Sequence, residues 1–497
     1  MVVLIALTGG AMLLPAAVGF TLREHALARA FLYSALLLIS LAMLIALAIR
    51  GMASRNQKFS HPFYYLAAAY LVLPLLMAIP MVEAIPGLGF FNAWFEMLSA
   101  FTTTGASVMQ DAGTRPINLW RATVAWGGGM FFLVAVTALL APLRLGGFEL
   151  FGMHSRVTQV ARGPAGRHLR SPLEGGYSDR SLSRMRSASA VIAPVYLAAT
   201  LVLWVGLSLA GNPPVIALIL AMATISTSGI APSGALGGFV AEVLIALVLL
   251  MALSRRLWPG AQIIRQEDPR LWCDTELRIA AAILVVLTLL LGLRAMYAPL
   301  DAAFAPRLAE LWGIVFTSLS FLTTAGFVSE VGRSAEGVFS GAAGTVLLAL
   351  ALCGGGVATT AGGVKLMRVF ALFWQARREV EKLVHPDSVG GDGPRLRLLR
   401  QEGAFSAWLF LMVFILSMTG LTALLTLTGV AMEDAMIYIT AALTTTGPVA
   451  QMTGPVPLDW ADLSRLGLAI SALGMVLGRL ELLLLLSVLW SRGSWAD

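Results

Sequence analysis

The stretch FTTTGAS at residues 101–107 returns in a similar form, ALTTTGPVA, at residues 442–450. Each closes a short apolar run, and four such runs end in a glycine: FNAWFEMLSAFTTTG (91–105), VIALILAMATISTSG (215–229), LWGIVFTSLSFLTTAG (311–326) and DAMIYITAALTTTG (434–447). Each is shorter than the roughly 20 apolar residues that a bilayer-spanning helix needs, but long enough for a half helix that enters and turns back. A spanning helix, a half helix, a Thr/Ser–Gly turn and a second spanning helix therefore recur four times, and such a repeat outweighs any single motif.

The composition places the chain in lipid. Hydrophobic residues make up 58% of the 497 residues, charged residues 12%, and the mean hydropathy is +0.83, whereas soluble domains carry about 25% charged residues. The net charge of +7 does not indicate nucleic acid, because the basic residues gather between apolar runs, as membrane topology requires. Cys273 and Cys353 suggest neither a disulfide framework nor a thiolate metal site. We predict an all-α polytopic membrane protein.

The order of apolar and polar segments predicts four pseudo-repeated helix–half helix–helix units around a central pore, preceded by two additional transmembrane helices. Apolar spans lie near 2–20, 28–49, 62–82, 118–142, 187–210, 237–253, 277–297, 341–375, 404–428 and 463–490. The predicted divisions are 1–60 (two extra helices), 61–144 (repeat 1), 145–186 (basic connection), 187–254 (repeat 2), 255–276 (connection), 277–375 (repeat 3), 376–403 (connection) and 404–497 (repeat 4).

The arginines predict the orientation. They are concentrated in the connections 143–186, 254–276 and 376–402, which the positive-inside rule assigns to the cytoplasm. Both termini then lie inside, and the Thr/Ser–Gly turns open toward the other side. The segment 431–462 contains four acidic residues and neither lysine nor arginine. A negative outer mouth of this kind concentrates cations.

The turns themselves predict an ion-binding filter. Non-helical backbone within the bilayer is tolerated only where it is buried in protein or lines water, so four turns at similar depth should meet around one axis. Rings of carbonyl oxygens replace the hydration shell of a monovalent cation, and the partly negative C-terminal end of each half helix favours that cation. Glycine permits positive φ and leaves the lumen open. The alternative is that each Thr-Thr-Gly only ends a helix. The predicted filter residues are Thr103, Thr104, Gly105, Thr227, Ser228, Gly229, Thr324, Ala325, Gly326, Thr445, Thr446 and Gly447.

The segments AFTTTGAS (100–107), FLTTAGF (321–327), ALTTTGP (442–448), GGGVATTAGGVKLMR (354–368) and GMVLGRLEL (474–482) resemble the Trk/Ktr/HKT superfamily of potassium transporters, in particular TrkH-type pore subunits. The resemblance spans essentially the whole chain. It implies potassium uptake across the bacterial cytoplasmic (inner) membrane, a homodimer with one pore per protomer, and a cytosolic nucleotide-binding regulatory partner of the TrkA type. Glycine at all four filter positions implies selectivity for potassium. The second repeat, TISTSGIAPSG (224–234), departs most from the pattern.

A glycine-rich stretch, GGGVATTAGG at 354–363, interrupts the second helix of repeat 3. Each glycine lowers helix stability by roughly 1 kcal/mol relative to alanine, so we predict an intramembrane loop beneath the filter that acts as a gate, as the resemblance also implies. The alternative is close packing of helices through small residues. The stretch matches neither a Walker A loop nor a Rossmann fingerprint. The predicted gate comprises Gly354, Gly355, Gly356, Thr359, Thr360, Gly362, Gly363, Lys365 and Arg479.

Arg479 lies among leucines in the second helix of repeat 4. A charged side chain at that depth is expensive unless it faces water, a partner or a cavity. In the family that the chain resembles, the matching arginine projects into the pore under the filter, which implies an electrostatic barrier here, with Lys365 in a similar role. A snorkelling or structurally paired arginine is the alternative.

The sequence as a whole predicts a potassium uptake subunit that is not an enzyme, contacts membrane lipid, needs no cofactor on this chain, carries no metal site other than potassium at the filter, and binds no nucleic acid. It leaves open a sodium-permeable or cation-coupled transporter of the same superfamily. An alternating-access transporter is a further alternative, because such proteins also contain repeats and broken helices. The five histidines show no metal-ligand spacing, and catalytic constellations are absent from the sequence.

Overall fold

A computed structural model describes residues 1–49, 62–109, 113–140, 177–232, 236–254, 256, 274–296, 304–331, 339, 344–385, 404–454 and 456–480. Most of the predicted basic connections 145–186, 255–276 and 376–403 lie outside the described residues. All predicted turn and gate residues lie inside them.

The described part of the chain is helical, and its long helices are apolar. Seven helical segments in these ranges are long and apolar enough to cross a membrane: Val2–Thr21, His25–Ile49, Tyr65–Ala84, Arg115–Leu139, Arg184–Leu209, Thr275–Leu293 and Ala404–Thr426. Many of their large apolar side chains, such as Leu44, Val202 and Leu416, point outward and are more than half exposed. An apolar exterior of this extent is stable in lipid and not in water.

Each repeat consists of an outer helix, a helix that ends at a Thr/Ser–Gly turn, and a return helix. We call the middle members the turn helices. Repeat 1 is formed by α4 (Pro62–Ala84), α5 (Phe90–Phe101) and α6 (Arg115–Ala135), and repeat 2 by α7 (Tyr177–Leu209), α8 (Pro214–Ser226) and α9 (Phe239–Leu249). Repeat 3 is formed by α10 (Thr275–Met296), α11 (Phe304–Leu322) and α13 (Gly344–Cys353), which continues after an interruption as α14 (Leu366–Val384). Repeat 4 is formed by α16 (Ala404–Thr426), α17 (Met432–Leu443) and α19 (Arg465–Leu480).

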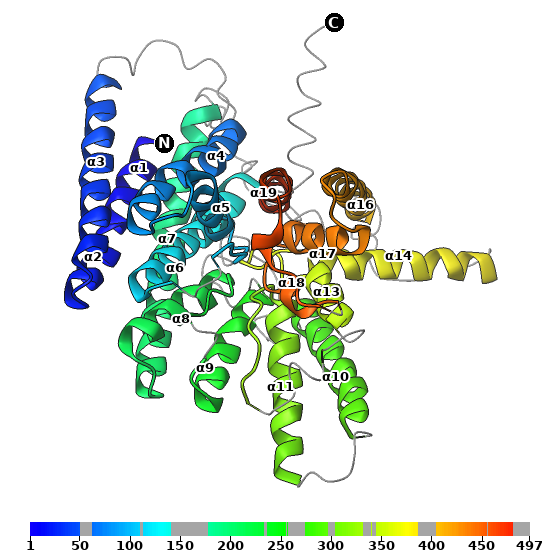
Figure 1. Ribbon diagram of the computed structural model, residues 1–497. Coiled ribbons are helices and arrows are strands. Elements are labelled where there is room, and N and C mark those ends of the chain that lie inside the picture. Colours follow the sequence, from blue (N-terminus) through cyan, green and yellow to red (C-terminus); the bar gives the residue numbers. More distant parts are fainter. Residues whose placement is uncertain are drawn as a thin grey trace, which may run out of the picture.

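The repeats are joined in a closed cycle. The return helix of each repeat packs against the turn helix of the next: α6 against α8, α9 against α11, and α13 against α17. The return helix of repeat 4, α19, packs against α5 of repeat 1 and completes the ring. Figure 1 shows the turn helices directed toward the centre of the molecule. Packing in chain order around one centre brings the four turns together.

The N-terminal helices lie outside this ring. α1 (Val2–Ala11) and α2 (Leu13–Thr21) pack on α3 (His25–Ile49), and α3 packs on α4 of repeat 1. α14 extends away from the ring on the opposite side (Figure 1). Its charges alternate with exposed apolar side chains, among them Phe373 and Val384.

Three elements differ from the sequence prediction in their bounds. The first span is two helices that meet at Met12. α6 ends in a π-helical turn, Val136–Leu140, a feature that often marks functional sites. α11 begins at Phe304, seven residues before the predicted apolar run, because Pro306 falls in its first turn, where a missing N–H leaves no helical hydrogen bond unmade.

Two glycines of the return helices allow this packing. A Cβ at Gly128 of α6 would overlap the carbonyl oxygen of Phe101, the last residue of α5, and a Cβ at Gly478 of α19 would overlap the carbonyl oxygen of Leu443, the last residue of α17. Both carbonyls stand four residues before the glycine of their turn. The return helices of repeats 1 and 4 therefore rest directly on the backbone that leads into the turns.

Substitution of these glycines should reveal that contact. We expect Gly128→Ala to destabilise the protein by about 1–3 kcal/mol, the usual effect of overpacking. The adjacent Gly127 has open space where a Cβ would stand, so Gly127→Ala should be neutral or stabilising. Thermal unfolding of the purified protein in detergent measures both. Equal melting temperatures for the two variants would contradict the close contact.

Candidate ion pathway

The four turns share one backbone conformation. In each, the residue two positions before the glycine is left-handed, with φ of 56° at Thr103, 54° at Thr227, 57° at Thr324 and 53° at Thr445. The amide of the following residue donates a hydrogen bond to the carbonyl five positions earlier in the turn helix, as Thr104 N does to Ser99 O (2.8 Å) and Ser228 N does to Ala223 O (2.9 Å). This is a Schellman cap. The turns do end helices, as the simpler interpretation required, but with a β-branched residue in a strained conformation, and such strain concentrates at functional sites.

The turns touch one another in a ring. A Cβ at Gly105 would overlap the carbonyl oxygen of Ser228 in repeat 2, and a Cβ at Gly229 would overlap that of Ala325 in repeat 3. A Cβ at Gly326 would stand 2.9 Å from the ring of Pro448 in repeat 4. A Cβ at Gly447 would overlap the amide of Ala106 in repeat 1 and so completes the ring. The predicted residues 103–105, 227–229, 324–326 and 445–447 thus surround one axis, and only glycine fits at each contact.

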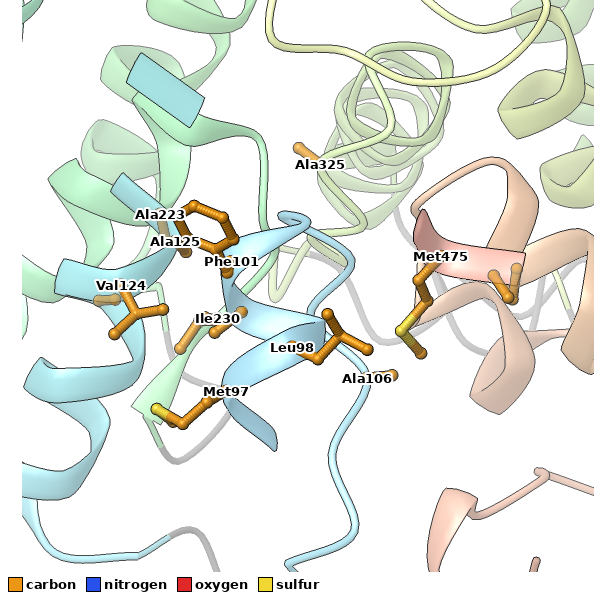
Figure 2. Close-up of a cluster of buried hydrophobic side chains, with 14 of the residues drawn as sticks. Met97, Leu98, Phe101, Ala106, Val124, Ala125, Ala223, Ile230, Ala325 and Met475 are labelled. Carbon is orange, nitrogen blue, oxygen red and sulfur yellow. The ribbon is translucent and has the colours of Figure 1, made fainter. Parts of the chain in front are cut away.

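Figure 2 shows the apolar packing beside this ring, with labelled side chains from every repeat. Leu98, Phe101 and Ala106 of repeat 1 share one cluster with Ala223 of repeat 2, Ala325 of repeat 3 and Met475 of repeat 4. The turns are therefore held by an apolar core that all four repeats build, and each turn's position depends on the other three.

The fourth turn differs from the others. Gly105, Gly229 and Gly326 have φ of 74°, 65° and 78°, whereas φ of Gly447 is not positive. The Gly447 amide donates a hydrogen bond to the Thr104 carbonyl (2.6 Å), and its own carbonyl accepts one from the Trp460 indole (3.3 Å). The sequence predicted that all four glycines adopt positive φ. Gly447 does not, and the position instead requires glycine because a side chain there would overlap Ala106 of repeat 1.

The four threonine hydroxyls at the left-handed positions differ in whether they form hydrogen bonds. Thr324 Oγ1 accepts a hydrogen bond from the amide of Gly362 (2.7 Å), and Thr227 Oγ1 donates to the carbonyl of Ser226 (2.7 Å). The hydroxyls of Thr103 and Thr445, in repeats 1 and 4, are buried without a hydrogen-bond partner. Buried polar atoms normally have a partner. Two hydroxyl oxygens are therefore left without a partner among the turns, one in repeat 1 and one in repeat 4.

The interrupting loop, residues 354–365, lies between Cys353, the last residue of α13, and Leu366, the first of α14. It is pressed against the turns. Besides the Gly362–Thr324 hydrogen bond, a Cβ at Gly362 would overlap the carbonyl oxygen of Thr444, and Thr360 Oγ1 donates to the carbonyl of Ile225 (3.2 Å). The loop therefore contacts the ends of three turn helices, α8, α11 and α17.

Hydrogen bonds also tie the loop to its surroundings. The amide of Gly356 donates to the carbonyl of Ala252 (3.0 Å), and the amide of Val357 donates to Glu276 Oε1 (2.8 Å). Glu276 is buried at the start of α10. A glycine-rich segment with so many hydrogen-bond partners is held in one conformation, and any movement of it requires the exchange of these hydrogen bonds.

Arg479 and Lys365 place two cations beside the loop. Arg479 is 2% exposed, its Nη1 donates to the carbonyl of Thr360 (2.7 Å), and its guanidinium stacks on Phe132 at 3.9 Å. Lys365 Nζ donates to the carbonyl of Ala361. Both line a cavity of about 10 Å³ next to Gly362 and Gly363, room for about one water molecule. Arg479 thus faces a cavity and a partner rather than lipid, and two positively charged side chains line this cavity.

The structure brings the predicted residues of both groups into one continuous site, and it adds buried charges that sequence reasoning passed over. Arg368 is fully buried against Phe410, with 3.8 Å between the guanidinium carbon and the ring centre. Glu96 and Glu242 are also fully buried. The signal was present in the sequence, since a carboxylate inside the apolar run FNAWFEMLSAF needs a partner in the membrane, but the partner could not be located without the fold.

These features define a polytopic α-helical membrane protein whose four repeats close around one axis. No protein-family model matches the chain. It is 30% identical to the Trk system potassium uptake protein TrkH of Vibrio parahaemolyticus over 424 residues, 81% of this chain and 79% of that one. It is 27% identical to TrkH of Salmonella typhimurium over 512 residues, 99% and 98% of the two chains. The crystal structure of the potassium transporter TrkH from Vibrio parahaemolyticus has the same fold, with a TM-score of 0.77 at 24% identity over 98% of this chain and 97% of that chain.

The chain belongs to the TrkH family. It is accordingly a multi-pass bacterial membrane protein and a member of a transporter family, not an enzyme.

The bond between loop and turn is testable with adjacent threonines. Thr324→Val removes the acceptor for the Gly362 amide and leaves that amide buried and unpaired, which destabilises the closed loop by about 1–3 kcal/mol. The Thr323 hydroxyl bonds only to its own helix, at Leu319 and Ser320, so Thr323→Val is the matched control. We expect amide hydrogen exchange across 354–365 to rise about tenfold in Thr324→Val alone. The same exchange rate in both variants would refute the contact.

Proposed function

We propose that the chain takes up potassium ions across the bacterial cytoplasmic membrane, with the four turns as a selectivity filter and the loop 354–365 as a gate. The observation that carries the proposal is the ring of close contacts between successive turns, from Gly105 to Ser228, Gly229 to Ala325, Gly326 to Pro448 and Gly447 to Ala106. The name of the TrkH relatives, potassium uptake proteins, supports potassium as the substrate ion.

In this mechanism a cation sheds water at the mouth and binds carbonyl and threonine oxygens in the ring. Four helix C-terminal ends, at Phe101, Ser226, Leu322 and Leu443, lie next to the site, and each contributes partial negative charge. In the conformation described, the Thr104 carbonyl is bonded to Gly447 and Pro448 lies against two filter glycines. Conduction therefore requires the fourth turn to withdraw and the loop to leave the filter, so this is a closed state.

The remaining predictions stay part of the proposal. The basic connections are cytoplasmic, both termini lie inside, and the protein is an inner-membrane homodimer that contacts lipid and a TrkA-like cytosolic regulator. The chain itself carries no cofactor. Whether potassium moves alone or with a coupled ion is decided by measuring uptake against imposed proton and sodium gradients.

Rubidium uptake tests the filter. In cells without potassium systems of their own, we expect Gly105→Asp or Gly447→Asp to reduce rubidium uptake at least tenfold, because the new side chain overlaps a neighbouring turn and buries a carboxylate. Gly89 is the matched control. It caps the start of the same helix α5 with open space around it, and aspartate is a favoured N-cap, so Gly89→Asp should retain uptake.

Unchanged uptake in Gly105→Asp and Gly447→Asp, with normal amounts of protein in the membrane, would refute the filter. Competition by sodium in the same assay separates the potassium-selective protein from a sodium-permeable one.

Removal of the buried guanidinium group of Arg479 tests the gate. Arg479→Ala removes positive charge from the path and frees the Thr360 carbonyl, so we expect rubidium uptake to rise severalfold. Arg465, exposed at the start of the same helix, supplies the control Arg465→Ala, which should match the wild type. A decrease in uptake with Arg479→Ala, in protein that is still folded, would contradict a gating barrier.

A further inference from the structure

Buried carboxylates bind the loops that follow two of the four turns. After Gly105, the loop residues Ser107, Val108 and Met109 all bond to Glu96 Oε1. The serine hydroxyl donates at 2.7 Å, the Val108 amide at 2.7 Å and the Met109 amide at 3.2 Å. Three donors thus converge on one carboxylate oxygen directly beside the first turn.

The same three donors recur after Gly326, and they bind Glu242. The Ser329 hydroxyl donates to Oε2 at 2.7 Å, and the amides of Glu330 and Val331 donate to Oε1 at 2.7 and 3.4 Å. In both loops the serine oxygen also accepts from the amide two residues later, at 3.2 Å. Two repeats with different sequences therefore build the same pocket for a carboxylate.

The two carboxylates come from different places. Glu96 stands nine residues before Gly105 on its own turn helix, α5. The equivalent position in repeat 3 is Thr317, nine residues before Gly326, and its hydroxyl only accepts from the Ser329 amide (3.2 Å). The carboxylate reaches the third loop from α9, the return helix of repeat 2. Repeat 3 lacks its own glutamate, and its neighbour supplies one.

Glu242 is bound from all sides within protein. It is 0% exposed, and the indole of Trp312 on α11 is its fourth donor, at 2.8 Å from Oε2. A second hydrogen bond joins the same two segments: the Leu236 amide, just before α9, donates to Glu330 Oε1 in the loop (2.5 Å). Glu96, in contrast, lies 3.0 Å from Arg121. Within the described ranges no ion pair includes Glu242, so its carboxylate is held by four neutral donors.

We propose that Glu242 is a positioning residue for the third filter turn, donated across the repeat boundary, and that it sets the discrimination between potassium and sodium. The inference rests on the proposed function. Carbonyl filters discriminate by the number and placement of oxygens around the ion. The loop from Ser329 to Val331 fixes the outer end of the third turn, and the carboxylate is the group that joins this loop to α9 and α11. Loss of its charge loosens one side of the filter while the other three remain.

Glu242→Gln tests the charge with little change of volume. A glutamine can still accept from the two loop amides, but its NH₂ group takes the place of the oxygen that accepts from the Ser329 hydroxyl and the Trp312 N–H. The Trp312 N–H only donates, so it repels that NH₂ group, and the Ser329 hydroxyl of the loop loses its acceptor. With the purified protein in liposomes, we expect the ratio of rubidium to sodium flux to fall about tenfold, a change of about 1.4 kcal/mol in discrimination. Glu83, exposed at the end of α4, gives the control Glu83→Gln, with the wild-type ratio.

A second variant moves the carboxylate to the position that repeat 1 uses. Thr317→Glu in the Glu242→Gln background places a glutamate on the turn helix of repeat 3, nine residues before its glycine, and we expect it to restore at least half of the lost flux ratio. This rescue separates positioning from general damage, because a merely structural defect at α9 would persist. If Glu242→Gln alone fails to fold, the double variant carries the test, and a selective double variant supports the proposal.

A wild-type ratio in Glu242→Gln, or a double variant that is unselective or unfolded, would overturn the role of Glu242 while the wild-type protein still conducts rubidium. Absence of flux from the wild-type protein would overturn the proposed function itself. The two failures are therefore distinguishable in one experiment.

Discussion

The structure depends on the close approach of four backbone turns around one axis. At Gly105, Gly229 and Gly447 even a single methyl group would overlap the backbone of the next repeat. Non-helical backbone within a bilayer must be enclosed by protein, and each turn is enclosed by the other three. The glycines of the return helices follow from this constraint, because α6 and α19 must lie directly on the last carbonyls of α5 and α17 to close the ring.

The turns and the interrupting loop form one hydrogen-bonded body. The Thr324 hydroxyl, at the left-handed position of the third turn, bonds to Gly362 of the loop, and Arg479 of the neighbouring repeat 4 holds the Thr360 carbonyl. A displacement of the loop therefore changes the surroundings of a turn, and a change in the turn alters the support of the loop. In the proposed mechanism, ion binding and gating are therefore coupled through direct contacts rather than over a distance. Glu276 extends the same network to the first turn of α10, where the chain leaves the 255–276 connection.

Much of the architecture could be predicted from the sequence because its cause is local. Apolar length gives the spanning helices, and the four Thr/Ser–Gly endings give the repeat. Glycine content gives the break in the third return helix, which the structure interrupts between Cys353 and Leu366. The first residue of α11 was harder to predict from the sequence, since a proline is compatible with either the first turn of a helix or a loop. The conformation of Gly447 could not be predicted either, because it depends on hydrogen bonds with Thr104 and Trp460, which belong to other parts of the chain.

The sequence by itself determined that this is a membrane protein of four repeats whose turns carry small and hydroxyl-bearing residues, since hydropathy and turn chemistry act over a few residues. Only the tertiary structure decided which groups share a site. Glu242 and Ser329 are 87 positions apart, and Arg479 and Thr360 are 119 apart, so no local pattern pairs them. The physical reason is that a buried charge is stable only with particular donors or acceptors around it, and those partners are fixed by how the repeats close into a ring.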